Sequence, residues 1–241
     1  MNEPLLVAAG VSKHFLGLRA VDEVSLSVNK GEIVSIIGPN GAGKTTFFNL
    51  LTGQLAPTIG EVRLRGVRIN DLPPHARAQM GMGRTFQIAK PLIALSALEN
   101  VMIGAFMRHA ALSTARDKAM LVLEKVGLAQ HAARRAGDLT LSERRRLEVA
   151  RALALEPEIV LLDEVMAGLN QSEVGQAIEL LQGLHATGLT FLIIEHNLKV
   201  VRAFSERVVV LDRGRVIAEG TADQILSSPE VIKAYLGEGH Q

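Results

Sequence analysis

The sequence predicts an α/β fold with a largely parallel sheet and an inserted helical part. Three apolar runs, at 32–38, 158–164 and 190–196, are typical of strands that are buried on both faces. Segments with helical spacing alternate with these runs, which favours parallel strands joined by helices. Between about 88 and 154 the sequence pattern is helical throughout. This stretch is therefore expected to be an inserted helical subdomain.

The N-terminal third of the chain contains mostly strands. VSLSV at 24–28 alternates apolar and polar residues, as a half-buried strand does. The apolar run at 32–38 ends in a glycine-rich turn, and TFFNLLTG behind it predicts a short helix that stops at Gly53. EVRLRG and VRI, at 61–69, predict two strands that turn at Gly66.

The later elements follow the same rules. Ser113 is expected to cap a helix that runs to Gly127. A second helix, at 172–188, places four apolar residues on one face: Ala177, Leu180, Leu181 and Leu184. VVVLDRGRVIAEG, at 208–220, predicts a hairpin.

The composition is that of a globular protein. Of 241 residues, 48% are hydrophobic and 21% are charged, and the net charge of +1 does not indicate a surface for nucleic acid. The arginines at 144–146 are read as a solvated or paired helix face. The absence of cysteine excludes disulfides, thiolate metal sites and thiol nucleophiles, and it fits a cytosolic protein.

No targeting or membrane-spanning segment is expected. The N-terminus lacks the pattern of a signal peptide. No apolar run approaches the ~18–20 residues that cross a bilayer. We expect no direct membrane insertion, so any membrane role should come through a partner.

GPNGAGKT at 38–45 has the spacing of a phosphate-binding loop, with a strand before it and a helix after it. Gly41 and Gly43 allow the backbone to fold closely around phosphates, and its N–H groups supply positive potential. Lys44 is expected to reach the β- and γ-phosphates, and the Thr45 hydroxyl to coordinate Mg²⁺. The predicted nucleotide-binding residues of this loop are Gly38, Asn40, Gly41, Gly43, Lys44, Thr45 and Thr46.

VLLDE at 160–164 supplies a second half of the site. Asp163 ends a buried strand, where the acidic partner of the metal should lie. Glu164 projects the other way and is a candidate to polarise the attacking water. Such a run alone is a weak signal, but it becomes strong about 120 residues after a phosphate loop.

The phosphate loop, LTLSERRRLEVARALA (139–154) and LLDE occur in the order and spacing of the ATP-binding subunits of ABC transporters. The resemblance covers essentially the whole chain and implies an ATPase that uses ATP and Mg²⁺. It implies one domain at 1–241 with the P-loop NTPase fold. A RecA-like core with an antiparallel β part would comprise 1–87 and 155–241, and the α-helical subdomain would comprise 88–154.

The resemblance also assigns roles to single residues. Phe15 matches the aromatic that stacks on adenine, and His196 matches the switch histidine that contacts the γ-phosphate. Gln87 matches the glutamine that senses the metal and the γ-phosphate and faces the membrane subunit. The implied catalytic residues are Lys44, Gln87, Glu164 and His196. The implied metal residues are Thr45, Gln87 and Asp163.

Other matching positions show departures from the family pattern. AGLN at 167–170 matches the D-loop, which meets the opposing subunit. Val165 stands where the family usually has proline, and Asn197 stands where aspartate often follows the histidine. Neither side chain is expected to touch the phosphates.

LTLSE at 139–143 occupies the positions of the family signature LSGGQ, which closes over ATP held by the other subunit. Thr140 keeps the hydroxyl, and Leu141 and Ser142 keep their N–H groups, so these three are assigned to the nucleotide in trans. Ser142 is also a candidate N-cap. If its position needs a positive φ, strain of about 1 kcal/mol is expected. Because Lys44, Glu164 and His196 are present, we predict a working, slower site.

The longer motifs resemble those of branched-chain amino acid importers, among them LIIEHNLKVV and PEVIKAYLGEG. This implies membrane-spanning subunits and a second ATP-binding subunit, identical or homologous, as partners. The chain would then lie in the cytoplasm, peripherally on the inner face of the cell membrane. Three alternatives stay open: a lipopolysaccharide-export ATPase, a regulatory subunit with weak hydrolysis, and a soluble protein that acts on nucleic acid or ribosomes. The near-neutral charge and the lack of a basic extension disfavour the last.

Overall fold

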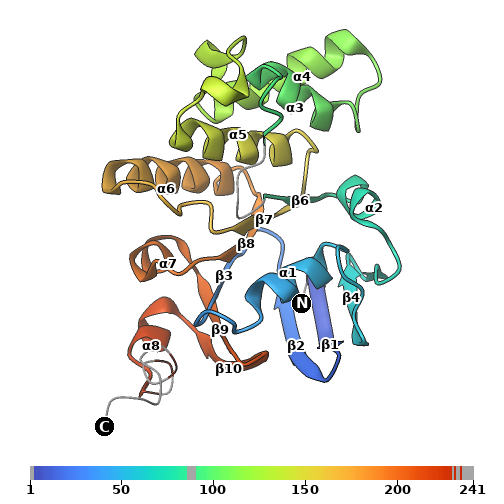
Figure 1. The fold of residues 1–241 in the computed structure, drawn as a ribbon, viewed down its shortest axis with the longest axis vertical. Helices are drawn as coiled ribbons and strands as arrows, with labels where there is room; N and C mark the ends of the chain where they lie inside the picture. The colour runs from blue at the N-terminus through green and yellow to red at the C-terminus, as the bar shows by residue number, and fades with distance from the viewer. Residues whose placement is uncertain (1–2, 86–90, 230, 232–233, 235–241) are drawn as a thin grey trace. The chain divides into compact units, whose positions relative to one another are not determined.

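The computed structural model describes residues 3–85, 91–229, 231 and 234 (Figure 1). Internal contacts divide the chain into two compact units. Unit 1 comprises Met1–Arg77 and Thr190–Gln241, and unit 2 comprises Ala78–Leu189. The division expected from the sequence, with a helical subdomain at 88–154, stays a prediction.

Unit 1 is built on strands of two sheets. One set is antiparallel in the order β2-β1-β4-β5. Its strands are β1 (Leu6–Phe15), β2 (Leu18–Val28), β4 (Ile59–Leu64) and β5 (Val67–Arg68). The other set has the order β10-β9-β3-β8, in which β3 is parallel to both neighbours and β10 is antiparallel. Its strands are β3 (Ile33–Ile37), β8 (Thr190–Ile194), β9 (Arg207–Asp212) and β10 (Arg215–Gly220).

The predicted turns of unit 1 are confirmed, and each has a local cause. The β4–β5 hairpin turns at Arg65 and Gly66, with φ values of +51° and +72°. The β9–β10 hairpin turns at Arg213 and Gly214, with φ values of +45° and +81°. Two consecutive positive φ values match the right-handed twist of the flanking strands.

Every residue of β3 and β8 is buried, as the continuous apolar runs predicted. The short helix after β3 is α1 (Lys44–Leu51), which buries Phe47, Phe48, Leu50 and Leu51. Unit 1 also contains α7 (Leu198–Phe204) and α8 (Ala222–Leu226), and α2 (Pro74–Gln79) leads towards unit 2.

A buried arginine closes the C-terminal end of α1. Arg77, which is 1% exposed, donates to the carbonyls of Leu50 and Leu51 at 2.8 and 2.7 Å, and to Asn70 and Leu72 at 3.1 and 2.9 Å. Burial lowers the pKa of Arg77 to about 10, so it keeps its charge at neutral pH. A cation suits this position because the C-terminal carbonyls of a helix carry partial negative charge.

Unit 2 contains a parallel strand pair and most of the long helices (Figure 1). Its strands are β6 (Met82–Arg84) and β7 (Ile159–Asp163). Its helices are α3 (Ala97–Ala105), α4 (Leu112–Lys125), α5 (Leu141–Leu153) and α6 (Gln171–His185), with short 3₁₀ turns η1 (Ala129–His131) and η2 (Ala136–Asp138). Helices α3, α4 and α5 pack against one another.

The prediction that Ser113 caps the second of these helices is wrong. The N-cap of α4 is Ala111, whose backbone is extended and whose carbonyl accepts a bond from Ala115. Ser113 lies inside the first turn. The buried stripe of Ala115, Ala119 and Leu123 sets the register of this helix, and it overrides the capping preference of serine.

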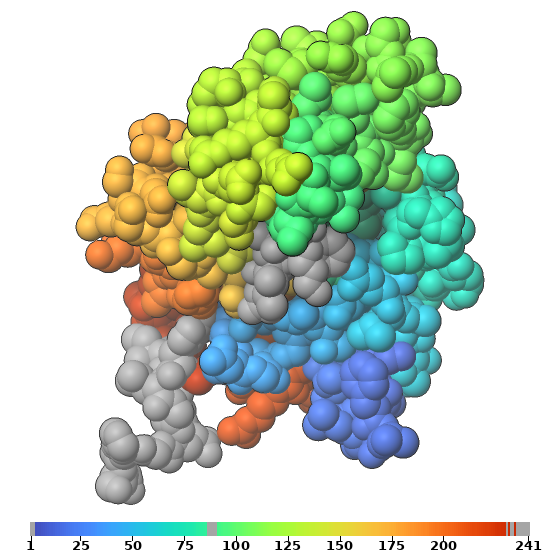
Figure 2. All heavy atoms as spheres, turned by 45° about the horizontal axis from the view of Figure 1, so that its top comes forward, coloured from blue at the N-terminus to red at the C-terminus, as the bar shows by residue number. Residues whose placement is uncertain are grey.

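Some apolar side chains of unit 2 are exposed at and just after the last turn of α3, whose surface is green in Figure 2. Ile103, Phe106 and Met107 are 45%, 43% and 38% exposed. Within the described ranges, no helix combines the length and apolarity that a membrane crossing requires.

Replacement of Arg77 tests the closure of α1. Arg77→Ala is expected to lower the free energy of unfolding by about 3 kcal/mol, because several backbone carbonyls lose a buried donor. Urea unfolding followed by circular dichroism measures this loss. Arg116→Ala, at an exposed site on α4, is the control and should change stability by less than about 0.5 kcal/mol. An equal effect of both substitutions would contradict the role of Arg77.

Candidate functional site

Two glycines of the loop between β3 and α1 are required by close backbone approach. A Cβ on Gly38, at φ +149°, would lie 2.0 Å from the carbonyl oxygen of Leu211. A Cβ on Gly43, at φ +97°, would lie 2.3 Å from the carbonyl oxygen of Ala20. Only glycine fits at both positions, so the loop is tightly held between β2 and β9.

The turn between β9 and β10 fastens this loop from one side. Gly214 N donates to Ala42 O at 3.0 Å, and Asp22 N donates to Gly214 O at 2.8 Å. The carboxylate of Asp22 also binds the Arg215 guanidinium at 2.6 and 2.9 Å. The hydrogen bond from Arg215 holds the pKa of Asp22 below its ordinary value. The loop is therefore held in place by contacts within unit 1.

Lys44 lies inside the curve of the loop. Its Nζ donates to Gly38 O at 2.7 Å and to Pro39 O at 2.9 Å, and the residue is 8% exposed. Lys44 is the first residue of α1, whose free N–H groups and dipole favour an anion. Thr45 and Thr46 follow in the same turn, with Thr45 exposed. The arrangement places positive charge where a phosphate chain would lie.

The other predicted residues of unit 1 lie at strand ends. Phe15 ends β1, is 41% exposed, and has Lys13 Nζ 5.3 Å from its ring centroid. His196 follows β8 and is exposed. Asn197 caps α7, because its side chain accepts a bond from Lys199 N. Asn197, which stands where aspartate often follows the histidine, therefore still caps a helix.

In unit 2, Asp163 ends β7 and is 1% exposed. Its Oδ2 lies 3.4 Å from Arg84 Nη2, and its N–H donates to Thr85 Oγ1 at 3.2 Å. Burial lowers the pKa of Arg84, and the nearby carboxylate opposes this shift. Neither Arg84 nor Thr85 was singled out from the sequence, because only the pairing of β6 with β7 brings them to Asp163.

The residue after Asp163 has an unusual backbone. Glu164 has φ +48°, a left-handed conformation that a side chain other than glycine seldom adopts. Val165 next to it is buried at 5% exposure and fixes the chain on that side. Strained backbone of this kind gathers at functional sites, where it directs one side chain. The left-handed backbone therefore supports the hypothesis that the Glu164 carboxylate takes part in the reaction.

Each unit contains, among its predicted metal residues, an oxygen donor of the type that Mg²⁺ prefers. Thr45 offers a hydroxyl in unit 1, and Asp163 offers a carboxylate in unit 2. Among the described residues, no group of three or more His, Asp, Glu or Cys side chains is close enough to hold an ion alone. Gln87, the third predicted metal residue, lies outside the described residues.

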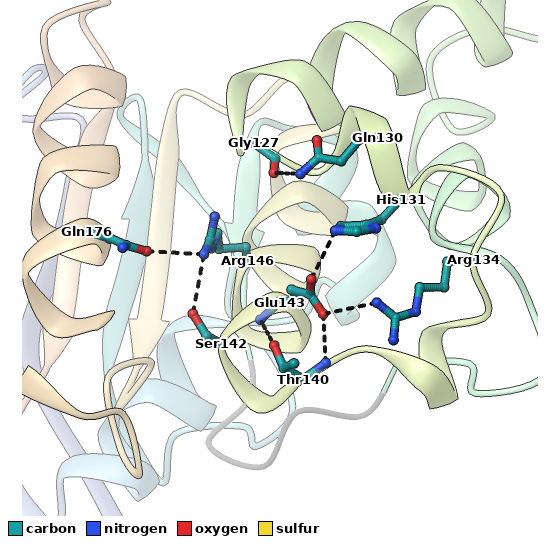
Figure 3. A network of polar contacts seen from close by, with 9 residues as sticks. All are labelled: Gly127, Gln130, His131, Arg134, Thr140, Ser142, Glu143, Arg146 and Gln176. Atoms are coloured by element: carbon teal, nitrogen blue, oxygen red, sulfur yellow. Dashed lines mark hydrogen bonds and ion pairs between the residues drawn. The ribbon is translucent and has the colours of Figure 1, made fainter. Parts of the chain in front are cut away.

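The predicted signature segment begins α5 (Figure 3). Thr140 is the N-cap: its Oγ1 accepts from Glu143 N at 3.3 Å, and Glu143 Oε2 accepts from Thr140 N at 2.7 Å. The suggestion that Ser142 caps this helix is wrong, because Ser142 lies inside its first turn. Neither Leu141 nor Ser142 has a positive φ, so the strain considered for Ser142 is absent. The pattern T-x-x-E signals this capping box in the sequence.

The arginines at 144–146 are paired, as expected. Arg144 donates to Gly137 O at 2.6 Å, and Arg145 donates to Ala167 O at 3.4 Å. Arg146 reaches both Ser142 Oγ at 3.5 Å and Gln176 Oε1 at 3.3 Å (Figure 3). These contacts join the start of α5 to the loop after β7 and to α6.

The glycine-rich loop between a buried parallel strand and a helix, with Lys44 and Thr45 at its end, defines a P-loop nucleotide-binding ATPase. Comparison with known proteins identifies the family within this class. The family model "ABC transporter" matches residues 21–167, and the model "Branched-chain amino acid ATP-binding cassette transporter" matches residues 215–241. The chain belongs to the ABC transporter family, as an ATP-binding cassette that hydrolyses ATP.

Two relatives illustrate the range of similarity. The chain is 43% identical to the high-affinity branched-chain amino acid transport ATP-binding protein LivG of Salmonella typhimurium, over 99% of this chain and 100% of LivG. It is 38% identical to the lipopolysaccharide export system ATP-binding protein LptB of Escherichia coli, over 97% of each chain.

Solved structures give the same fold. A nucleotide-free ATP-binding cassette from an ABC transporter superposes with a TM-score of 0.90 at 33% identity, over 98% of this chain and 100% of that one. A dimeric post-hydrolysis state of the cassette MJ0796, bound to ADP and Pi, gives 0.81 at 29% identity, over 90% and 98%. The predicted fold class, with its parallel and antiparallel strands, is confirmed.

A substitution at Gly43 tests the tight fit of the phosphate loop. Gly43→Ala is expected to weaken ATP binding at least ~100-fold, because the added Cβ would clash with Ala20 O and displace the loop. Binding of a fluorescent ATP analogue measures the affinity. Gly31→Ala is the matched control: Gly31 has φ +74° but open space around its Cβ position, so affinity should stay within about threefold. Similar affinities of both variants would show that the loop tolerates displacement.

Proposed function

We propose that this ATPase drives an importer of branched-chain amino acids. The full-length similarity to LivG carries this proposal, and the match of residues 215–241 to a branched-chain amino acid transporter model supports it. The similarity over the full chain and the match at its C-terminal part therefore point to one group of transporters. The transported molecule itself would be held by partner subunits.

Each half of the site has a defined task in this proposal. Lys44 binds the phosphates and stabilises the charge that develops on the γ-phosphate during transfer to water. His196 contacts the same phosphate, and Glu164 orients or deprotonates the attacking water. Phe15 stacks on the adenine. Thr45 and Asp163 are the residues that would hold Mg²⁺, which would neutralise phosphate charge.

The unusual backbone of Glu164 supports its assigned role. A carboxylate that polarises water must keep its direction within a narrow range. The left-handed conformation at φ +48°, with Val165 buried beside it, sets the direction in which the side chain leaves the backbone. Gln87 is proposed to report nucleotide occupancy to the membrane subunits.

The reaction is proposed to need a second ATP-binding subunit. Thr140, Leu141 and Ser142 offer a hydroxyl and N–H groups at the start of α5, where a phosphate held by the other subunit is favoured. The fold similarity to a cassette solved as a dimer with ADP and Pi supports such pairing. The partner is an identical or a homologous chain, and closure of the pair drives membrane-spanning subunits. The chain then lies on the cytoplasmic face of the membrane.

Export of lipopolysaccharide is the second candidate, since the chain is 38% identical to LptB. The branched-chain model at the C-terminal part favours import. The absence of a positive φ at Ser142 removes one reason for the alternative of a subunit with weak hydrolysis, whereas the loss of glycine's close backbone approach at 141 and 142 remains a reason for it.

A variant that binds ATP but does not hydrolyse it should hold two ATP-binding subunits together, and it therefore tests the ATPase mechanism. In Glu164→Gln, hydrolysis should fall by at least ~100-fold while ATP binding persists, because only the group that acts on water is neutralised. Sedimentation with ATP should then show a pair of ATP-binding subunits that ADP does not support. Glu124→Gln, at an exposed site on α4, is the control and should hydrolyse ATP normally. Normal turnover in Glu164→Gln would remove Glu164 from the mechanism.

Uptake of leucine tests the substrate class. Cells that lack this chain should take up labelled leucine poorly, and the unmodified chain should restore uptake. Lys44→Ala should fail to restore it, whereas Lys125→Ala, at an exposed lysine of α4, should succeed. Unchanged leucine uptake with a defective outer envelope would favour the lipopolysaccharide reading instead.

A further inference from the structure

A carboxylate lies at the centre of the polar network that begins α5 (Figure 3). Glu143 Oε2 accepts a bond from Thr140 N at 2.7 Å, and Glu143 N returns one to Thr140 Oγ1. These two bonds fix both the backbone and the hydroxyl of Thr140. Glu143 therefore sets the position of the threonine that the proposed function assigns to the phosphate.

The same carboxylate creates an electrostatic problem. Glu143 is the third residue of α5, so its negative charge lies within one turn of the N–H groups of Leu141 and Ser142. An approaching phosphate is also negative. At a few ångströms two like charges repel by about 1 kcal/mol even in water, and by more in a site that excludes water. A carboxylate here needs positive charge beside it.

Two basic side chains from the segment before the helix face this carboxylate. His131 Nε2, at the end of η1, lies 3.1 Å from Glu143 Oε1, and Arg134 Nη1 lies 3.9 Å from Glu143 Oε2 (Figure 3). Although burial raises it, hydrogen bonds from Thr140 together with these two basic side chains hold the pKa of Glu143 below its ordinary value. The side chain of Glu143 is 15% exposed, so solvent screens these charges only in part.

The arginines of α5 have other partners. Arg144 binds Gly137 O, and Arg146 binds Ser142 and Gln176 of α6. Among the described residues, His131 and Arg134 are the charged groups that act on Glu143.

We propose that Glu143 is the positioning residue of the signature segment, and that His131 and Arg134 supply the positive charge that lets a phosphate in trans approach it. The inference rests on the proposed docking of Thr140–Ser142 onto nucleotide held by a second subunit. The neutral glutamine of the LSGGQ signature would need no such partner.

A double-mutant cycle tests this coupling. Glu164→Gln chains trap the ATP-bound pair, either with themselves or with the ATP-binding subunit that co-purifies with them. In this background His131→Gln should weaken ATP-driven association roughly fivefold. Glu143→Gln keeps an oxygen for Thr140 N but removes the charge. His131→Gln should therefore have no effect in Glu143→Gln chains.

His109→Gln is the matched control, because His109 Nε2 binds Glu156 Oε1 at 2.9 Å away from α5. It should lower thermal stability as much as His131→Gln does and leave association unchanged. An equal effect of His131→Gln with and without Glu143→Gln would overturn the role of Glu143 and His131 alone. If every chain binds ATP and none associates with either partner, docking in trans fails, and the proposed mechanism is overturned together with this inference.

Discussion

The phosphate loop depends on backbone packed against backbone. Gly38 approaches the carbonyl of Leu211, and Gly43 approaches the carbonyl of Ala20, at distances that leave no room for a side chain. The turn at Gly214 bonds to Ala42 and to Asp22, so segments far apart in the sequence fix one loop. Since the N–H groups of a loop bind phosphate well only when they are already directed inward, this packing prepares the site. Arg77 extends the same constraint to the far end of α1.

In unit 2 the comparable constraints act on two single residues, Asp163 and Glu164. Asp163 is buried beside Arg84, and Glu164 holds a left-handed backbone. Burial of the Asp163 carboxylate and the left-handed backbone of Glu164 each cost stability. The packing of β6 on β7 and of Val165 offsets this cost. The acid that would bind the metal and the acid that would act on water thus differ in environment, although they are adjacent in the chain. Different surroundings let two identical charges do different work.

Local chemistry made much of the fold predictable from sequence. Continuous apolar runs gave β3, β7 and β8, and glycine at the second turn position gave both hairpins. The cap of α4 was misplaced because the buried stripe of Ala115, Ala119 and Leu123, not Ser113, sets its register. Burial of Arg77 and the Arg84–Asp163 pair depend on contacts between distant residues, which no local pattern contains. The capping box at Thr140 is visible in the sequence as T-x-x-E, and it gives the segment a regular helical start although the glycines of LSGGQ are absent.

The regular helical start of α5 has an entropic consequence. Glycine loses more conformational freedom on folding than any other residue, and in a helix it is less stable than leucine or serine by up to about 1 kcal/mol. Leu141 and Ser142 therefore favour a first turn that is already formed. A binding surface that is ordered in advance loses less freedom when its ligand arrives. Leu141 and Ser142, which stand where the signature has glycines, therefore give α5 a first turn that is ordered before the ligand binds, whereas glycines would leave this backbone more flexible.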